Sequence, residues 1–132
     1  MTPRPTTIAP WVPTVPHTGL TRWGHSAMDC TFEIILAGVE AGYARTFAQA
    51  AFSEVDRLES ELSRFRPGSD IRRINQSPPG QAVPLGLDAL DCLALAQTLT
   101  TATRSAFDVT LGSGSITLDV DRKTCTRRSD ST

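Results

Sequence analysis

The sequence predicts an α+β fold, in which an antiparallel sheet packs with two main helices. Residues 31–36 and 115–121 alternate between apolar and polar side chains, as strands with one solvated face do. Residues 40–64 carry apolar side chains at three- and four-residue steps, which indicates an amphipathic helix. The order of strand, long helix, loop, helix, strand and second strand departs from the regular alternation of a doubly wound sheet.

Length and composition are those of one small domain. The 132 residues are 39% hydrophobic and 20% charged, and 13 basic residues against 14 acidic ones give a formal charge of -1. A nucleic-acid-binding protein normally has a strong basic excess, so that class is excluded. No run approaches 18 apolar residues, which excludes a membrane span. The three cysteines and two histidines lack the spacing of zinc ligands.

The chain is expected to begin with a flexible tail at residues 1–22. This segment is rich in proline and threonine, and proline prevents regular helix geometry. It also lacks the continuous apolar run of a secretory signal, so the expected location is the cytoplasm. The folded region is expected at residues 23–121. In its first strand, at 31–36, one face carries Phe32, Ile34 and Leu36.

The helix at 40–64 follows. Pro67-Gly68 ends it, because this pair cannot continue a helix. Residues 70–75 indicate a short helical turn, and the proline-rich segment 77–80 indicates a loop. The apolar face of the helix is expected to consist of Ala44, Phe47, Ala48, Ala51, Val55, Leu58 and Leu62.

A second helix is expected at 88–104, with an apolar face that includes Leu90, Leu93 and Ala96. Residues 106–110 are expected to be extended. The turn at 112–114 leads into the strand at 115–121, and residues 122–132 are polar enough to predict a frayed tail.

Residues whose side chains could bind a ligand or take part in a reaction gather in three stretches, at 25–30, 62–75 and 106–110. Phe65, beside arginines at a helix end, can stack on a planar ring, and Met28 can place a polarizable thioether against the same ring. Asp108 can accept hydrogen bonds from a ribose hydroxyl or a ring N–H. Each residue also has a structural interpretation, with Phe65 and Met28 in the core.

Other polar residues have weaker functional interpretations. His25 is a candidate acid–base group because imidazole can both donate and accept a proton, but the sequence gives it no partner, which favours a structural role. Asp119 and Asp121 share one strand face, where a solvated surface is favoured over a cation site.

In this order and spacing, the three stretches resemble the N-terminal part of the FAD:protein FMN transferase (ApbE-like) family. The family opens on Ala-Met-Gly-Thr, matched here by Ala27-Met28-Asp29-Cys30. A long helix then ends in Leu-Ser-x-aromatic-x-x-x-Ser-x-(Ile/Leu)-x-x-(Ile/Leu)-Asn, matched by residues 62–75. A second helix leads into Gly-Ala-Phe-Asp-(hydrophobic)-Thr, matched by residues 105–110. The resemblance covers roughly residues 23–121.

The resemblance implies an activity and a set of ligands. Members of the family cleave the pyrophosphate of FAD and attach FMN through a phosphoester to a threonine of a partner flavoprotein, using Mg²⁺. It further implies that the matching residues here contact FAD. These FAD-binding candidates are Met28, Phe65, Ala106, Phe107 and Asp108.

The chain also departs from the family pattern. Asp29 and Cys30 replace Gly and Thr, Phe65 stands where Tyr is common, and Ser105 replaces Gly. The later Asp-x-Gly-Gly-x-x-Lys-Gly segment and the metal-binding Asp and Thr do not occur in these 132 residues. No catalytic residue and no metal ligand is therefore assigned, and a truncated family member is expected.

Three hypotheses follow. The chain can act with a separately encoded C-terminal half, it can be a non-catalytic flavin-binding or partner-binding remnant, or it can be a non-functional product that aggregates or forms a homodimer through exposed apolar surface.

Overall fold

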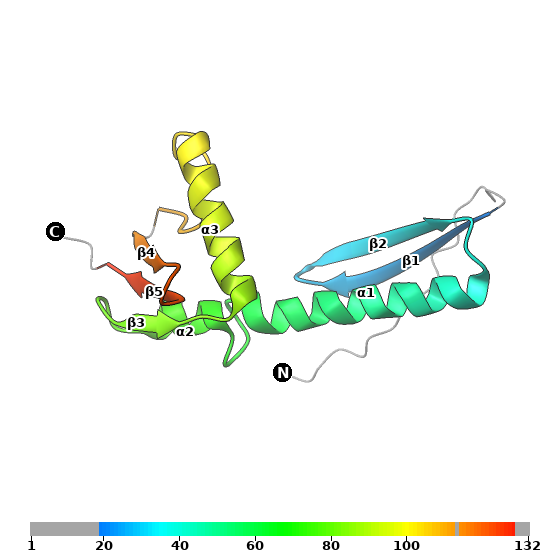
Figure 1. The fold of residues 1–132 in the computed structure, drawn as a ribbon, viewed down its shortest axis with the longest axis horizontal. Coiled ribbons are helices and arrows are strands. Elements are labelled where there is room, and N and C mark those ends of the chain that lie inside the picture. Colours follow the sequence, from blue (N-terminus) through cyan, green and yellow to red (C-terminus); the bar gives the residue numbers. More distant parts are fainter. Residues whose placement is uncertain (1–18, 113, 129–132) are drawn as a thin grey trace. The chain divides into compact units, whose positions relative to one another are not determined.

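The computed structural model describes residues 19–112 and 114–128 (Figure 1). Within these ranges the chain forms three helices and five strands, and the strands belong to two small antiparallel sheets. The α+β class with antiparallel strands is confirmed. The chain divides into two compact units, residues 1–59 and residues 60–132, and each is described separately below.

Unit 1 contains a β-hairpin. Strand β1 (Leu20–Ala27) pairs with strand β2 (Cys30–Ala37) over eight residues each, with Ala27 opposite Cys30. Met28 and Asp29 therefore form a two-residue turn, and both have positive φ, at 51° and 57°. Positive φ at both central residues matches the twist of the flanking strands, which is why hairpins favour such turns.

One face of this hairpin packs on helix α1 (Ala41–Leu62). His25, which is buried, stacks on the Phe52 ring at 4.9 Å, and its Nε2 lies 2.7 Å from Oδ1 of Asp56. The Met28 amide donates to Glu59 across 3.1 Å. The partner missing for His25 in the sequence is therefore Asp56, 31 residues further along the chain.

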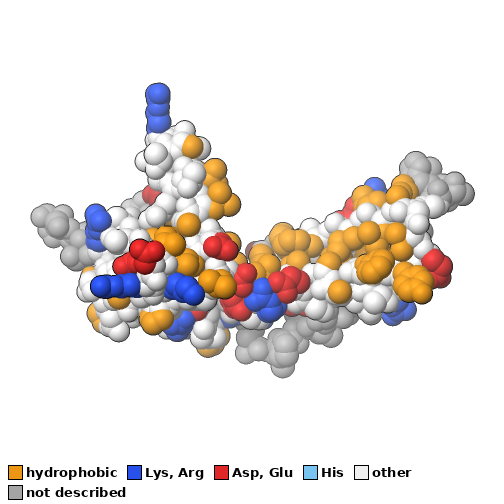
Figure 2. All heavy atoms as spheres, viewed as in Figure 1, with side chains coloured by type: hydrophobic (Ala, Val, Ile, Leu, Met, Phe, Trp, Pro, Cys, Tyr) orange, Lys and Arg blue, Asp and Glu red, His pale blue; other side chains and the backbone are white. Residues whose placement is uncertain are grey.

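The buried face of α1 is offset from the predicted one. Ala44, Ala48 and Phe52 are buried at strict four-residue steps, whereas Phe47, expected in the core, is 54% exposed. Tyr43 lies one turn before Phe47 and is also exposed. Figure 2 shows hydrophobic side chains gathered on the visible face of this unit. The three- and four-residue steps fit two neighbouring stripes, and only tertiary packing decides between them.

Unit 2 is built around a three-stranded sheet in the order β3-β5-β4. Its strands are β3 (Ala82–Pro84), β4 (Ile116–Asp119) and β5 (Thr124–Arg127). Cys125, on the central strand, is fully buried, and Val83 and Leu118 are its partners on either side. Pro84 lacks an amide hydrogen, which suits β3 as an edge strand.

Two helices complete the unit. Helix α2 (Asp70–Gln76) supplies Ile74 to the core, and helix α3 (Leu87–Ala102) supplies Ala89, Leu90 and Leu93. Beyond Ala96, α3 extends past the sheet (Figure 1), and Leu99 is 40% exposed. The hydroxyls of four threonines there donate to carbonyls four residues back, which satisfies them within the helix.

Several expectations need correction. The segment expected as a tail at 1–22 includes the start of β1 at Leu20, while residues 1–18 lie outside the described part of the chain. Likewise, 122–132 contains β5, whose single apolar residue, Cys125, is its only sequence signal. Residues 106–110 are not extended but form bends and turns after α3.

Candidate functional site

The segment from Leu62 to Asn75 is held by its own serines. The Ser63 hydroxyl accepts the Phe65 amide at 3.1 Å, and the Ser69 hydroxyl donates to the Ser63 carbonyl. Ser69 is 1% exposed and caps α2 by accepting the Arg72 amide at 3.0 Å. The Ser-x-aromatic-x-x-x-Ser spacing therefore fixes a compact turn between α1 and α2.

Phe65 lies on the surface of this turn. It is 69% exposed, so the core alternative for this residue is wrong. The guanidinium of Arg64 sits over one face of the ring, 4.6 Å from its centre. Arg72 donates to the Phe65 carbonyl at 2.8 Å, which fixes the backbone beneath the ring.

Asp70 ties this turn to the start of α3. Its side chain accepts the Gly86 amide at 2.7 Å and pairs with the Arg73 guanidinium. A Cβ at Gly86 would lie only 3.3 Å from the same carboxylate, so the backbone approaches closely there. Asp70 is 9% exposed, and its charge is thus satisfied inside the unit.

The segment after α3 is built of tight turns. Thr103 accepts the Phe107 amide at 2.9 Å, which fastens residues 103–107 to the helix end. Oδ1 of Asp108 accepts the Thr110 amide at 2.9 Å and its hydroxyl at 2.7 Å, and Oδ2 accepts the Gly112 amide at 3.0 Å. These bonds favour the ionised carboxylate and hold the pKa of Asp108 below its ordinary value, chiefly through Thr110.

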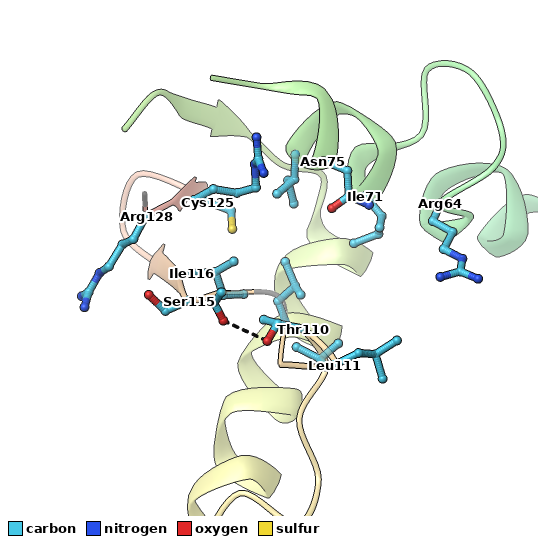
Figure 3. Close-up of a pocket in the computed structure, with 14 residues that line it drawn as sticks. Arg64, Ile71, Asn75, Thr110, Leu111, Ser115, Ile116, Cys125 and Arg128 are labelled. Carbon is cyan, nitrogen blue, oxygen red and sulfur yellow. Dashed lines mark hydrogen bonds between the residues drawn. The ribbon is translucent and has the colours of Figure 1, made fainter. Parts of the chain in front are cut away.

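A pocket of about 340 Å³ lies between these two segments and the sheet (Figure 3). Its walls come from the 62–75 segment, from loop residues 109–111 and 114–115, and from the three-stranded sheet, so both motif segments contribute to one cavity. The 62–75 segment contributes Arg64, Ile71, Ile74 and Asn75, and the loop contributes Val109, Thr110, Leu111, Gly114 and Ser115. The remaining wall is Leu93, Ile116, Cys125, Arg127 and Arg128.

The pocket is apolar inside and basic at its margins. Ile74, Leu93 and Cys125 are buried, and burial raises the pKa of the Cys125 thiol, which keeps it neutral. Arg64 and Arg128 lie at opposite ends (Figure 3), and no acidic side chain is among the described residues that line the cavity. This arrangement suits a ligand that combines an apolar ring with anionic groups.

The five residues proposed from the sequence lie beside this cavity or in the other unit. Ala106, Phe107 and Asp108 directly precede the lining loop, and Phe65 follows the lining Arg64. Met28 belongs to unit 1, where it is 40% exposed at the hairpin turn. None of the five is a lining residue.

The sequence argument missed most of the residues that do line the cavity. Ile71, Ile74 and Asn75 have the i, i+3, i+4 spacing of one helix face, which could have indicated them. No sequence signal indicated Cys125 or Arg127, because the strand that carries them was not predicted.

The resemblance implies a magnesium ion, which takes oxygen ligands such as carboxylates. Among the residues that the structure describes, no three His, Cys, Asp or Glu side chains are grouped to hold a metal ion. Asp119 uses Oδ1 to accept the Arg122 amide at 2.9 Å in a turn.

Two departures from the family pattern fall at special backbone positions. Asp29 has φ of 57° and Ser105 has φ of 65°, and both stand where the family pattern has glycine. Glycine is favoured in this left-handed region because it has no Cβ to clash.

Comparison with known proteins agrees with the motifs. A model described as the ApbE family matches residues 28–129, which is most of the chain. No curated protein and no solved structure matches it at a significant level. In the described part of the chain, no helix is long and apolar enough to cross a membrane.

Proposed function

This chain belongs to the ApbE family of flavin transferases, and from this premise we propose that it binds FAD as an FMN transferase-like protein, with the pocket of unit 2 as a binding surface for the flavin nucleotide. The observation that carries the proposal is the meeting of the two motif segments. The 64–75 segment and the loop that begins at Val109 are separated by a whole helix, yet both contribute residues to the lining of this cavity.

The size of the pocket limits what it can hold. At about 340 Å³ it lies near the lower end of ligand pockets, which run from roughly 300 to 1,000 Å³. It therefore has room for one ring system, while the rest of the dinucleotide lies outside. Ile71, Ile74 and Ile116 offer apolar contact to a planar ring, and Arg64 or Arg128 can pair with a phosphate.

The transfer reaction places further demands on the protein. The threonine hydroxyl oxygen of the acceptor bonds to the FMN phosphorus of FAD, the pyrophosphate bond breaks, AMP leaves, and the hydroxyl proton is released. Mg²⁺ supplies charge neutralisation on the phosphates in this family. The described residues of this chain can bind and orient the flavin nucleotide, and we assign none of them to the transfer step.

Binding is tested by titrating the protein into FAD and following flavin fluorescence. Val109→Trp, at a 43% exposed position in the pocket wall, should block the cavity and weaken FAD binding at least about tenfold. Val120→Trp is the matched control, because Val120 is 58% exposed and does not line the pocket. A wild-type chain that does not bind FAD, or equal effects of the two variants, would refute the proposal.

A second assay separates transfer from binding alone. The chain is incubated with FAD, Mg²⁺ and a threonine-bearing acceptor peptide, with and without a second polypeptide that carries the Asp-x-Gly-Gly-x-x-Lys-Gly segment. Covalent FMN on the peptide, detected by mass, supports the transferase. FAD binding without any transfer in either mixture supports the alternative, a non-catalytic flavin-binding member of the family.

A further inference from the structure

We propose that Asp108 is a positioning residue, which shapes the loop wall of the pocket formed by residues 109–111 and 114–115 instead of contacting the ligand. This inference rests on the proposed function, because it assigns the residue that shapes the same pocket. It also changes the role expected from the resemblance, which was direct contact with FAD.

The loop forms a large share of the pocket but has little packing of its own. It supplies Val109, Thr110, Leu111, Gly114 and Ser115 to the lining. Leu111 is 82% exposed and Val109 is 43% exposed, so burial of apolar surface contributes little to holding them. Other interactions must therefore fix the shape of this wall.

The backbone of the loop is also in conformations that need support. Leu111 has φ of 53° and Gly112 has φ of 74°, both in the left-handed region. For a residue with a Cβ, such as Leu111, this region is unfavourable because the Cβ comes close to the following carbonyl oxygen. Leucine disfavours a positive φ, so neighbouring hydrogen bonds must stabilise Leu111 in this conformation.

The Asp108 carboxylate supplies most of those bonds. It accepts the amides of Thr110 and Gly112 on either side of Leu111, at 2.9 and 3.0 Å. It also lies 2.7 Å from the Thr110 hydroxyl, which in turn lies 2.9 Å from the Gly114 carbonyl (Figure 3). One side chain thus joins both ends of the turn, and each of its oxygens already accepts a bond from the protein.

The charge of Asp108 strengthens this arrangement. Hydrogen bonds to a carboxylate are roughly twice as strong as those between neutral groups. The same bonds lower the pKa of Asp108, so the carboxylate remains ionised at neutral pH. A ligand that donated a hydrogen bond to this carboxylate would have to compete with three donors of the loop.

The test measures the loop and the ligand separately. Amide hydrogen exchange at Thr110 and Gly112 is followed by NMR without ligand, and FAD affinity is followed by flavin fluorescence. Asp108→Ala should speed exchange at both amides about tenfold and weaken FAD binding by a similar factor. Asp108→Asn keeps one acceptor oxygen and should restore part of the protection from exchange and part of the FAD affinity.

Asp119→Ala is the matched control. Asp119 also accepts a turn amide in unit 2, from Arg122, but does not line the pocket. It should leave exchange at Thr110 and FAD affinity unchanged. Far-UV circular dichroism checks that each variant keeps its helices.

The outcomes distinguish the two proposals. Unchanged exchange in Asp108→Ala would overturn the positioning role, as would weaker FAD binding with exchange unaltered, which would indicate direct contact. If wild-type protein fails to bind FAD, the proposed function fails, and the exchange measurement alone decides whether Asp108 holds the loop.

Discussion

The hairpin turn of unit 1 carries a strained residue that glycine should relieve. Asp29 occupies the second position of the Met28–Asp29 turn with φ of 57°. Its side chain is exposed, so Asp29→Gly removes no packing. We expect this substitution to increase the free energy of unfolding of unit 1.

The magnitude follows from the backbone. A left-handed conformation costs an ordinary L-residue roughly 1–2 kcal/mol, and aspartate lies at the lower end because its short polar side chain can bond locally. Glycine removes this cost but loses more conformational entropy on folding. The expected net gain is therefore about 0.5 kcal/mol, which shifts Tm by about 2–4 °C in a domain of 60–100 residues.

The assay is urea unfolding followed by Trp23 fluorescence in a Trp11→Phe background, because Trp23 lies on β1. Asp29→Asn is the control for charge, since the turn lies beside the Glu59 carboxylate that accepts the Met28 amide. Asp29→Ala should be less stable than wild type. The strain argument is refuted if Asp29→Gly gives no gain, or if Asp29→Asn gives the same one.

Two further predictions concern unit 2. Ser105→Gly should raise stability by about 1 kcal/mol, since Ser105 has φ of 65°; urea unfolding followed by far-UV circular dichroism measures it, and a loss of stability would contradict the strain. Asp70→Ala should lower stability by about 3 kcal/mol, because it leaves the close-packed Gly86 amide without its acceptor and Arg73 without its carboxylate. Asp70→Asn should lower the free energy of unfolding less in the same assay, and an equal loss would show that the charge of Asp70 contributes nothing to stability.

Elements with strong periodicity were predictable from the sequence. Helices α1 and α3 and strand β2 lie within a few residues of their expected bounds, because each has several apolar residues on one face. Strands β1, β3 and β5 were missed. These strands form because they pair with neighbouring strands, which their own sequences do not indicate. A strand with a single buried residue, such as Cys125, has no apolar pattern to detect.

The site residues expected from the sequence stay a prediction. The motif stretches 62–75 and 106–110 both contribute residues to the lining of the pocket. The individual side chains were harder to assign, because a carboxylate such as Asp108 has the same sequence signature whether it binds a ligand or a backbone amide. Only the positions of Thr110 and Gly112 distinguish these roles.

The burial of Cys125 has a practical consequence for labelling. Thiolates react with alkylating reagents, so a buried thiol with a raised pKa reacts slowly, while exposed Cys30 and Cys92 react fast. A reagent pulse would modify these two first, and Cys125 would then be modified only when the pocket wall opens. The alkylation rate of Cys125 therefore reports how often the cavity opens, and a ligand that fills the cavity should lower that rate.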